Sequence, residues 1–85
     1  MNVAEKKDLR KMKLSELYNH NEKTGGRDAH IRFSDLTSNE ENKQEHLAYE
    51  YLAYKGLIHY KINANNNYYL AKITSYGIDL IEDEN

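Results

Sequence analysis

Gly56 separates two segments of different periodicity, and this change constrains the fold more than any other feature of the sequence. Residues 39–55 contain neither glycine nor proline and predict a long helix. After Gly56, the runs 57–62 and 68–73 are rich in β-branched and aromatic residues, and the asparagine-rich segment 63–67 between them favours a tight turn. The second half therefore predicts a helix that leads directly into a β-hairpin.

A short closing helix is predicted after the hairpin. Thr74 is a suitable N-cap, and Ile78 and Ile81 have the i, i+3 spacing of one helix face. Residues 82–85 then form an acidic tail. Since no linker or internal repeat is visible, we predict a single domain over residues 1–85.

The first half begins with a predicted helix over residues 2–22. Asn2 and Glu5 match a capping box at its start. Gly25 and Gly26 supply the backbone freedom that the end of a helix requires.

The segment before the long helix predicts a short strand and one helical turn. Apolar residues alternate within 29–33, which favours a strand, and residues 34–37 are expected to form a single turn. Ser38 and Glu41 then match a capping box that opens the long helix. The predicted order is helix, short strand, helix-turn-helix, two-stranded hairpin and helix.

Helical periodicity assigns the two sides of the long helix to different environments. Four residues form a stripe that we expect to lie in the core: Leu47, Ala48, Tyr51 and Leu52. The opposite side is expected to face solvent or a partner, and it carries Asn39, Asn42, His46, Tyr49, Glu50 and Ala53.

Composition limits what the chain is able to do. With 85 residues and no cysteine, it must hold together by packing alone, without disulfides or thiolate metal ligands. The N-terminal segment is charged and lacks an apolar stretch, so we expect a cytoplasmic protein with no membrane partner. The four histidines stand singly, and no catalytic or phosphate-binding motif occurs. We therefore expect no enzyme activity, metal site or cofactor.

The net charge of −2 conceals an uneven distribution. Residues 1–32 carry eight Lys or Arg against five Asp or Glu, whereas residues 33–85 carry four against nine. Four of those nine acids lie in the last seven residues. The average charge therefore does not exclude a basic surface for nucleic acid.

Two short motifs in the second half resemble those of winged-helix domains. Such domains have a helix that ends in Leu-x-x-x-Gly-Leu-Ile, which here is Leu52 followed by residues 56–58, and an Ile-Thr-x-x-Gly motif that opens the last helix, here Ile73, Thr74 and Gly77. On these residues, the chain resembles the small winged helix-turn-helix regulators of bacteria, archaea and phages. The resemblance implies an α+β winged-helix fold in which residues 38–55 form the recognition helix and residues 63–67 the wing.

This resemblance implies binding of double-stranded DNA by a small transcription regulator, which we expect to be a homodimer. Base contacts are expected from the recognition helix, and backbone contacts from the two wing strands. The candidate DNA-binding residues are Asn39, Asn42, Lys43, His46, Tyr49, Lys61 and Lys72.

An alternative function is protein binding without DNA, for example by a phage or mobile-element factor that inhibits a host protein. The chain contains eight tyrosines, which are effective interface residues because they are large, stiff and polar at one end. The candidate interface residues are Tyr49, Tyr54, Tyr60 and Tyr68. Scattered cations and an acidic, tyrosine-bearing recognition helix would favour a protein partner. DNA would be favoured by convergence on one face of the basic residues Arg10, Lys11, Arg27, Arg32, Lys43, Lys61 and Lys72.

Overall fold

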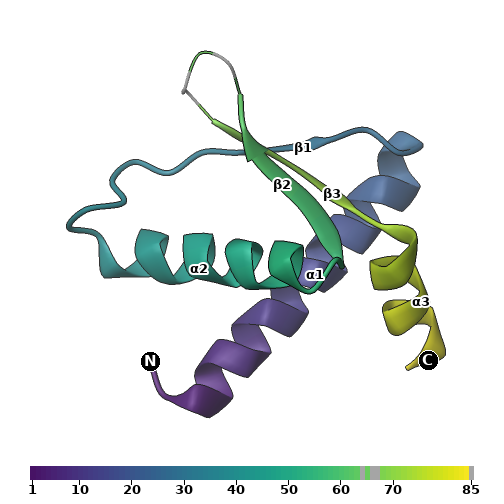
Figure 1. Cartoon of the computed structure of the whole chain (residues 1–85), viewed down its shortest axis with the longest axis horizontal. Helices are drawn as coiled ribbons and strands as arrows, with labels where there is room; N and C mark the ends of the chain where they lie inside the picture. The colour runs from purple at the N-terminus through teal and green to yellow at the C-terminus, as the bar shows by residue number, and fades with distance from the viewer. Residues whose placement is uncertain (64, 66–67, 85) are drawn as a thin grey trace.

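A computed structural model describes residues 1–63, 65 and 68–84 of the chain as an α+β fold (Figure 1). The elements follow the order α, β, α, β, β, α. Their bounds are α1 Val3–Thr24, β1 Ala29–Ile31, α2 Glu40–Tyr54, β2 Ile58–Ile62, β3 Tyr69–Ile73 and α3 Ser75–Asp83. The predicted closing helix and both hairpin strands are confirmed with shifts of one or two residues, whereas the predicted tight turn at residues 63–67 lies partly outside the described residues.

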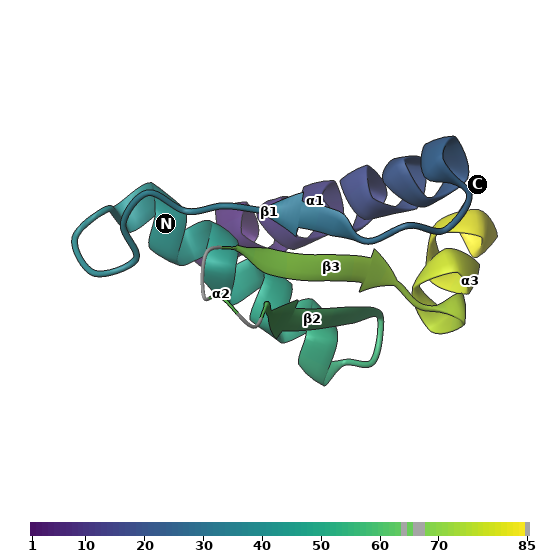
Figure 2. The same cartoon turned by 90° about the horizontal axis from the view of Figure 1, so that it is seen from above.

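The three strands form one antiparallel sheet in the order β1-β3-β2. Ala71 at the centre of β3 pairs with Ala29 on one side and with Tyr60 on the other. The predicted short strand therefore joins the hairpin, and the sheet has three strands instead of two. Seen from above, the strands lie in front of α1 and α2, so both helices cover the same face of the sheet (Figure 2).

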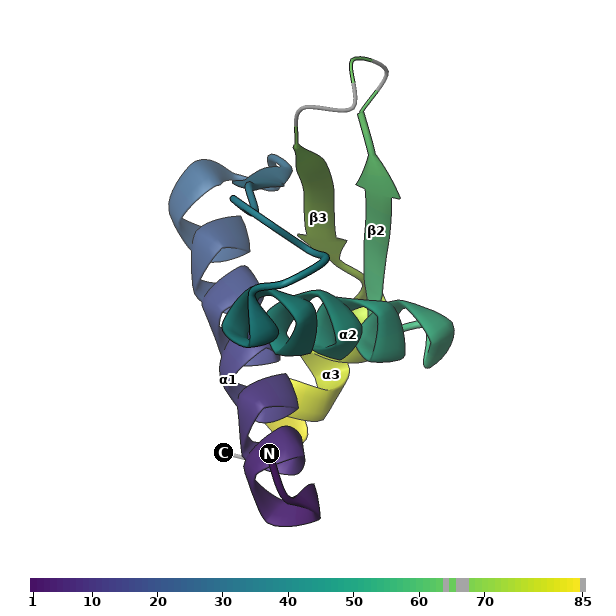
Figure 3. The ribbon, with the colours of Figure 1, turned by 90° about the vertical axis from the view of Figure 1, so that its left-hand side faces the viewer.

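The core lies between this covered face and the helices. Leu14 and Leu17 from α1 and Leu52 from α2 are buried against strand residues such as Ile58 and Ile73. Helix α2 crosses α1, and the hairpin extends away from both helices (Figure 3). Among the described residues, no helix combines the length and the apolarity needed to cross a membrane.

Local signals in the sequence fix both ends of α1. The side chain of Asn2 accepts a hydrogen bond from the Glu5 amide at 2.8 Å, and the Glu5 carboxylate accepts one from the Asn2 amide at 3.1 Å. Gly25 ends the helix in the left-handed conformation with φ of 71°. The predicted capping box and glycine exit are confirmed.

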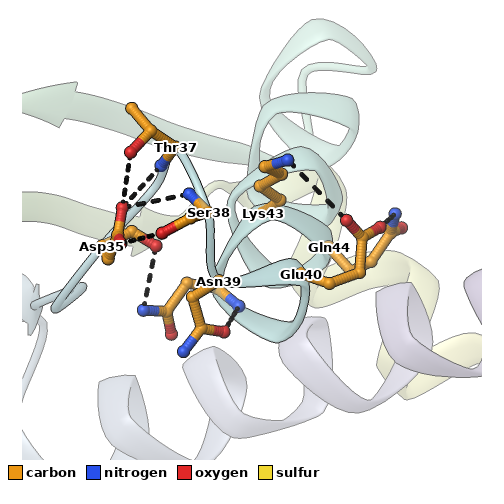
Figure 4. Close-up of polar contacts among 8 residues, drawn as sticks. Asp35, Thr37, Ser38, Asn39, Glu40, Lys43 and Gln44 are labelled. Atoms are coloured by element: carbon orange, nitrogen blue, oxygen red, sulfur yellow. Dashed lines mark hydrogen bonds and ion pairs between the residues drawn. The ribbon is translucent and has the colours of Figure 1, made fainter.

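The start of α2 differs from the prediction. Its N-cap is Asn39, whose side chain accepts a hydrogen bond from the Asn42 amide, and Ser38 lies outside the helix. Residues 34–37 contain no helix, and a hydrogen-bonded turn covers residues 36–38. Instead, one carboxylate oxygen of Asp35 accepts hydrogen bonds from the Thr37 amide at 2.8 Å and the Ser38 amide at 3.1 Å, while the Ser38 hydroxyl donates to the other oxygen (Figure 4). This side chain offers the backbone a partner other than a helix, so no helix-turn-helix forms.

The orientation of α2 about its axis is also different. Tyr49, predicted to face outward, is only 4% exposed, whereas Leu47, predicted in the core, is 52% exposed. The physical reason is aromatic packing, because the Tyr49 ring stacks on Tyr60 of β2 with centroids 5.2 Å apart. That contact turns Tyr49 and Leu52 inward and leaves Leu47 and Tyr51 on the outside.

The two motifs of the winged-helix resemblance meet at the base of the hairpin. The Thr74 amide donates to the Leu57 carbonyl at 2.9 Å, and the Thr74 hydroxyl donates to the Gly56 carbonyl at 2.7 Å. Gly56 has φ of 77°, which glycine adopts readily. At Gly77 in α3, a Cβ atom would overlap the Leu57 carbonyl oxygen. These contacts attach α3 to the turn between α2 and β2.

Candidate nucleic-acid interface on the sheet

The predicted DNA-binding residues of α2 do not form a common outward surface. Asn39 caps the helix. Asn42 donates from its side-chain amide to the Ser34 hydroxyl at 2.9 Å and to the Asp35 carbonyl at 3.3 Å. Lys43 lies 3.8 Å from the Glu40 carboxylate. Each polar group is engaged in holding the start of the helix, so base recognition by these side chains is not favoured.

His46 and Tyr49 point toward the sheet and not toward solvent. The His46 Nδ1 atom lies 2.8 Å from the Tyr60 hydroxyl. Tyr60 stacks between Tyr49 and Tyr69, and its centroid lies 4.7 Å from that of Tyr69. Burial raises the pKa of Tyr49 and that of Tyr60 above the usual range, which keeps both hydroxyls protonated. Tyr49 is 4% exposed and Tyr60 is half-buried, so these two rings pack between α2 and the sheet and do not form the outward interface that the sequence predicts.

The other two predicted interface tyrosines lie on different elements, at the end of α2 and before β3. Tyr54, at the end of α2, is 88% exposed. Tyr68 precedes β3 and is half-buried, with its ring stacked on His30 at a centroid distance of 4.7 Å. The tyrosines therefore do not form a single contact surface.

Lys61 and Lys72 lie on the face of the sheet that no helix covers. Along β2 and β3, the residues directed at the helices are buried or half-buried apolar ones such as Ile58 and Ala71, and their neighbours point the other way. We call this second surface the open sheet face. It comprises His30, Arg32, His59, Lys61, Tyr68, Leu70 and Lys72.

Cations and rings alternate across the open sheet face. Leu70 on the central strand pairs with His30 on one side and Lys61 on the other, and Lys72 pairs with His59. Beyond the end of β1, the Arg32 guanidinium lies 5.3 Å from the Tyr68 ring centroid. Arg32 therefore extends the stack of Tyr68 and His30 as a cation–π partner.

Acidic residues are scarce on this face: among the described residues that follow the strand alternation, only Asp28 belongs to it, directly before β1 and opposite Lys72 in the register. The three strands contain no Asp or Glu, and in the described part of the chain Arg32, Lys61 and Lys72 form no ion pair. At the end next to α3, a hollow of about 620 Å³ lies beside His59 and Lys72, with the exposed ring of Tyr76 at its margin. The open sheet face is thus a positively charged surface that also carries exposed rings.

Only three residues of the open sheet face, Lys61, Lys72 and Tyr68, are among those predicted from the sequence. Arg32 was predicted only as one of the basic residues whose convergence favours DNA, and His30 and His59 were missed, although a signal for them was present. In a strand, every second residue shares one face, so His59 accompanies Lys61 and His30 accompanies Arg32. The missing information was the pairing of β1 with β3, which brings the two sets together.

The basic residues whose grouping distinguishes DNA from protein binding separate into distinct sets. Arg32, Lys61 and Lys72 belong to the open sheet face, while Arg10 lies on the helical side with its guanidinium 3.8 Å from the Tyr51 ring centroid.

Within the described residues, no group of three or more His, Asp or Glu side chains is placed to hold a metal ion. Comparison with known proteins finds no matching family model, curated protein or solved structure. A function for this chain therefore has to be inferred from the chemistry of its surfaces.

Proposed function

We propose that this chain is a nucleic-acid-binding module of the winged-helix type, and that it binds through the open sheet face. The observation that carries the proposal is that Arg32, Lys61 and Lys72 share one face of the sheet with the stacked rings of His30 and Tyr68, on strands that contain no acidic residue. Cations that track a backbone and aromatic rings that stack on bases are the two components of a nucleic-acid surface.

Single-stranded nucleic acid fits this surface better than a duplex. A ring that lies on a sheet stacks only on a base that is not already stacked inside a helix. The guanidinium of Arg32 and the ammonium groups of Lys61 and Lys72 then contact phosphates on either side of the bases. Recognition of this kind is tolerant of sequence, because every base offers a flat face.

Recognition of duplex DNA by α2 is less favoured. Glu40 and Glu41 in its first turn are exposed, as are Leu47 and Tyr54 farther along. Carboxylates repel phosphates, and the Leu47 side chain offers no hydrogen bond to a base edge. The β1-β3-β2 sheet and the α2-hairpin-α3 order support the winged-helix type, although the turn at Asp35 stands where such a domain has a helix before α2. The chemistry of α2 does not support a transcription regulator that reads DNA with this helix.

The proposal is tested by fluorescence anisotropy with a labelled single strand of about 20 nucleotides and its matched duplex. We expect tighter binding to the single strand. Three phosphate contacts give a slope of log K against log salt of about −2, so affinity falls roughly 20-fold between 50 and 200 mM salt. No binding of the single strand at 50 mM salt overturns the proposal.

A matched pair of neutral variants locates the contact. Lys61→Gln on β2 is expected to make the salt slope less steep by about 0.7, which corresponds to one lost phosphate contact. Lys43→Gln on α2 removes the same charge and is expected to leave the slope unchanged. If only Lys43→Gln changes the slope, the contact lies on α2 and the open sheet face is not the site.

A further inference from the structure

A second surface lies on the helical side, where a groove of about 450 Å³ runs between α1, the end of α2 and α3. Its floor is apolar and includes Leu14, Leu52 and Leu57. Its lining carries one acid, Glu84 of α3, against four cations, Lys7, Arg10, Lys11 and Lys55, so the groove has a net positive charge. An apolar groove with a positive rim is suited to an acidic amphipathic helix.

The rim cations have no carboxylate partner within the described residues. The ion pairs of that part of the chain involve Lys13, Lys43 and His46 instead. Arg10 lies over the Tyr51 ring, and the Lys55 ammonium lies 5.7 Å from the same ring centroid, so two cations flank one aromatic side chain. The charge of the rim is therefore available to a partner.

The complementary chemistry lies on α3, which forms one wall of the groove. Asp79, Asp83 and Glu84 are exposed and make no ion pair with any described residue. Leu80 in the same helix is 42% exposed although it lines the groove. The last turn of α3 therefore presents an apolar side chain between acidic ones.

The position of α3 is fixed by a hydrogen bond to α1. The Tyr18 hydroxyl donates to the Glu82 carboxylate at 2.8 Å, and this bond raises the pKa of Tyr18 to about 12. Glu82 is thus occupied within the chain, while its acidic neighbours remain directed at solvent. A cationic groove and an acidic helix end consequently lie side by side in a fixed arrangement.

From this arrangement we infer that the groove receives α3 of a second copy of the chain. A surface that carries both complementary parts side by side is self-complementary, and a two-fold axis brings each acidic α3 to the cationic groove of the other copy. Two equivalent contacts then form at once, each joining Lys7, Arg10, Lys11 and Lys55 of one copy to Asp79, Asp83 and Glu84 of the other. This dimer does not depend on nucleic-acid binding, since it leaves the open sheet face uncovered.

Reciprocal charge reversal tests the dimer. The variant Lys7→Glu/Lys11→Glu makes the groove acidic, and Asp83→Lys/Glu84→Lys makes the end of α3 basic. Each variant alone places like charges together in both contacts, so we expect the dimer dissociation constant to rise at least roughly tenfold. An equimolar mixture places opposite charges together in both contacts, so we expect heterodimers to form.

Sedimentation equilibrium at 50 mM salt measures the mass of the unaltered chain, of each variant and of the mixture. Far-UV circular dichroism verifies that each variant is folded. Lys61→Glu on the open sheet face is the control, and we expect it to dimerise as the unaltered chain does. A monomeric unaltered chain at 200 μM overturns the inference. So does a dimer that resists both reversals, or a mixture of folded variants that stays monomeric.

Discussion

The open sheet face and the outward side of α2 are both accessible to a partner, but their chemistry is opposite. The sheet face carries Arg32, Lys61 and Lys72 without a carboxylate on its strands, whereas α2 presents Glu40 and Glu41 in its first turn and apolar side chains beyond. In a winged-helix protein the second of these surfaces is expected to contact DNA. Element order therefore does not assign the binding surface, which follows from the side chains that each element turns outward.

The largest expected effect compares the two sides of α2 itself. Tyr49→Ala removes a ring that is packed against Tyr60, and we expect a loss of about 3–4 kcal/mol in the free energy of unfolding. Tyr54→Ala removes an exposed ring from the same helix and should change stability by less than about 0.5 kcal/mol. Urea unfolding measures both values. Equal losses would show that α2 is oriented differently about its axis.

The next effect compares the sheet face with α2 in nucleic-acid binding. Arg32→Glu/Lys61→Glu puts two carboxylates beside phosphate, and we expect single-strand affinity to fall about 100-fold, or about 2.7 kcal/mol. Glu40→Lys/Glu41→Lys makes the same size of charge change on α2 with the opposite sign. We expect this second variant to change affinity less than about threefold in anisotropy titrations. A large gain from it would move the binding surface to α2.

A smaller effect is expected where α3 is attached to the base of the hairpin. Gly77→Ala introduces a Cβ that overlaps the Leu57 carbonyl oxygen and the Ile73 side chain, and we expect a loss of about 2 kcal/mol on thermal or urea unfolding. Gly56→Asn is the matched control, because its Cβ meets open space and asparagine tolerates positive φ. We expect the control to lose less than about 1 kcal/mol. Comparable losses would indicate that backbone conformation matters more than the close contact at Gly77.

The smallest effect concerns the turn that precedes α2. Hydrogen bonds from the Ser38 and Thr37 side chains and amides hold the pKa of Asp35 below its usual range. A depressed carboxylate pKa contributes stability above the unfolded-state value of about 3.9, and this contribution declines as pH falls toward the folded-state value. Asp35→Asn should therefore be less stable than the parent at pH 7 and differ less from it at pH 3. A difference that grows on acidification would contradict this sign.

Much of the fold could be predicted because short motifs determine it. The Asn2 capping box, Gly25, Gly56 and Thr74 each act through their own backbone or that of residues nearby, and each marks an element boundary in the structure. The absent helical turn has the same local origin. The Asp35 carboxylate accepts hydrogen bonds from the amides of Thr37 and Ser38. An aspartate followed closely by threonine and serine is the sequence signal for this turn, which competes with a helix for the same amides.

The candidate site was harder to predict because it depends on contacts between distant segments. Apolar and aromatic residues from Leu47 to Tyr54 lie on both sides of α2, so periodicity alone does not decide which side is buried. Stacking of Tyr49 on Tyr60 decides it. Likewise, Arg32 becomes a neighbour of Tyr68 only because β1 pairs with β3.

The attachment of Thr74 and Gly77 to the Gly56–Leu57 turn has a mechanical consequence. The start of β2 and the start of α3 are fastened at one point, whereas farther along the hairpin the contacts are to α2, through the Tyr60 hydroxyl beside His46 and the Tyr69 ring 5.2 Å from the same imidazole. Rotation of the hairpin about its base must therefore carry α3 with it. Motion of the hairpin base is thereby coupled to α3, which forms one wall of the groove on the helical side of the molecule.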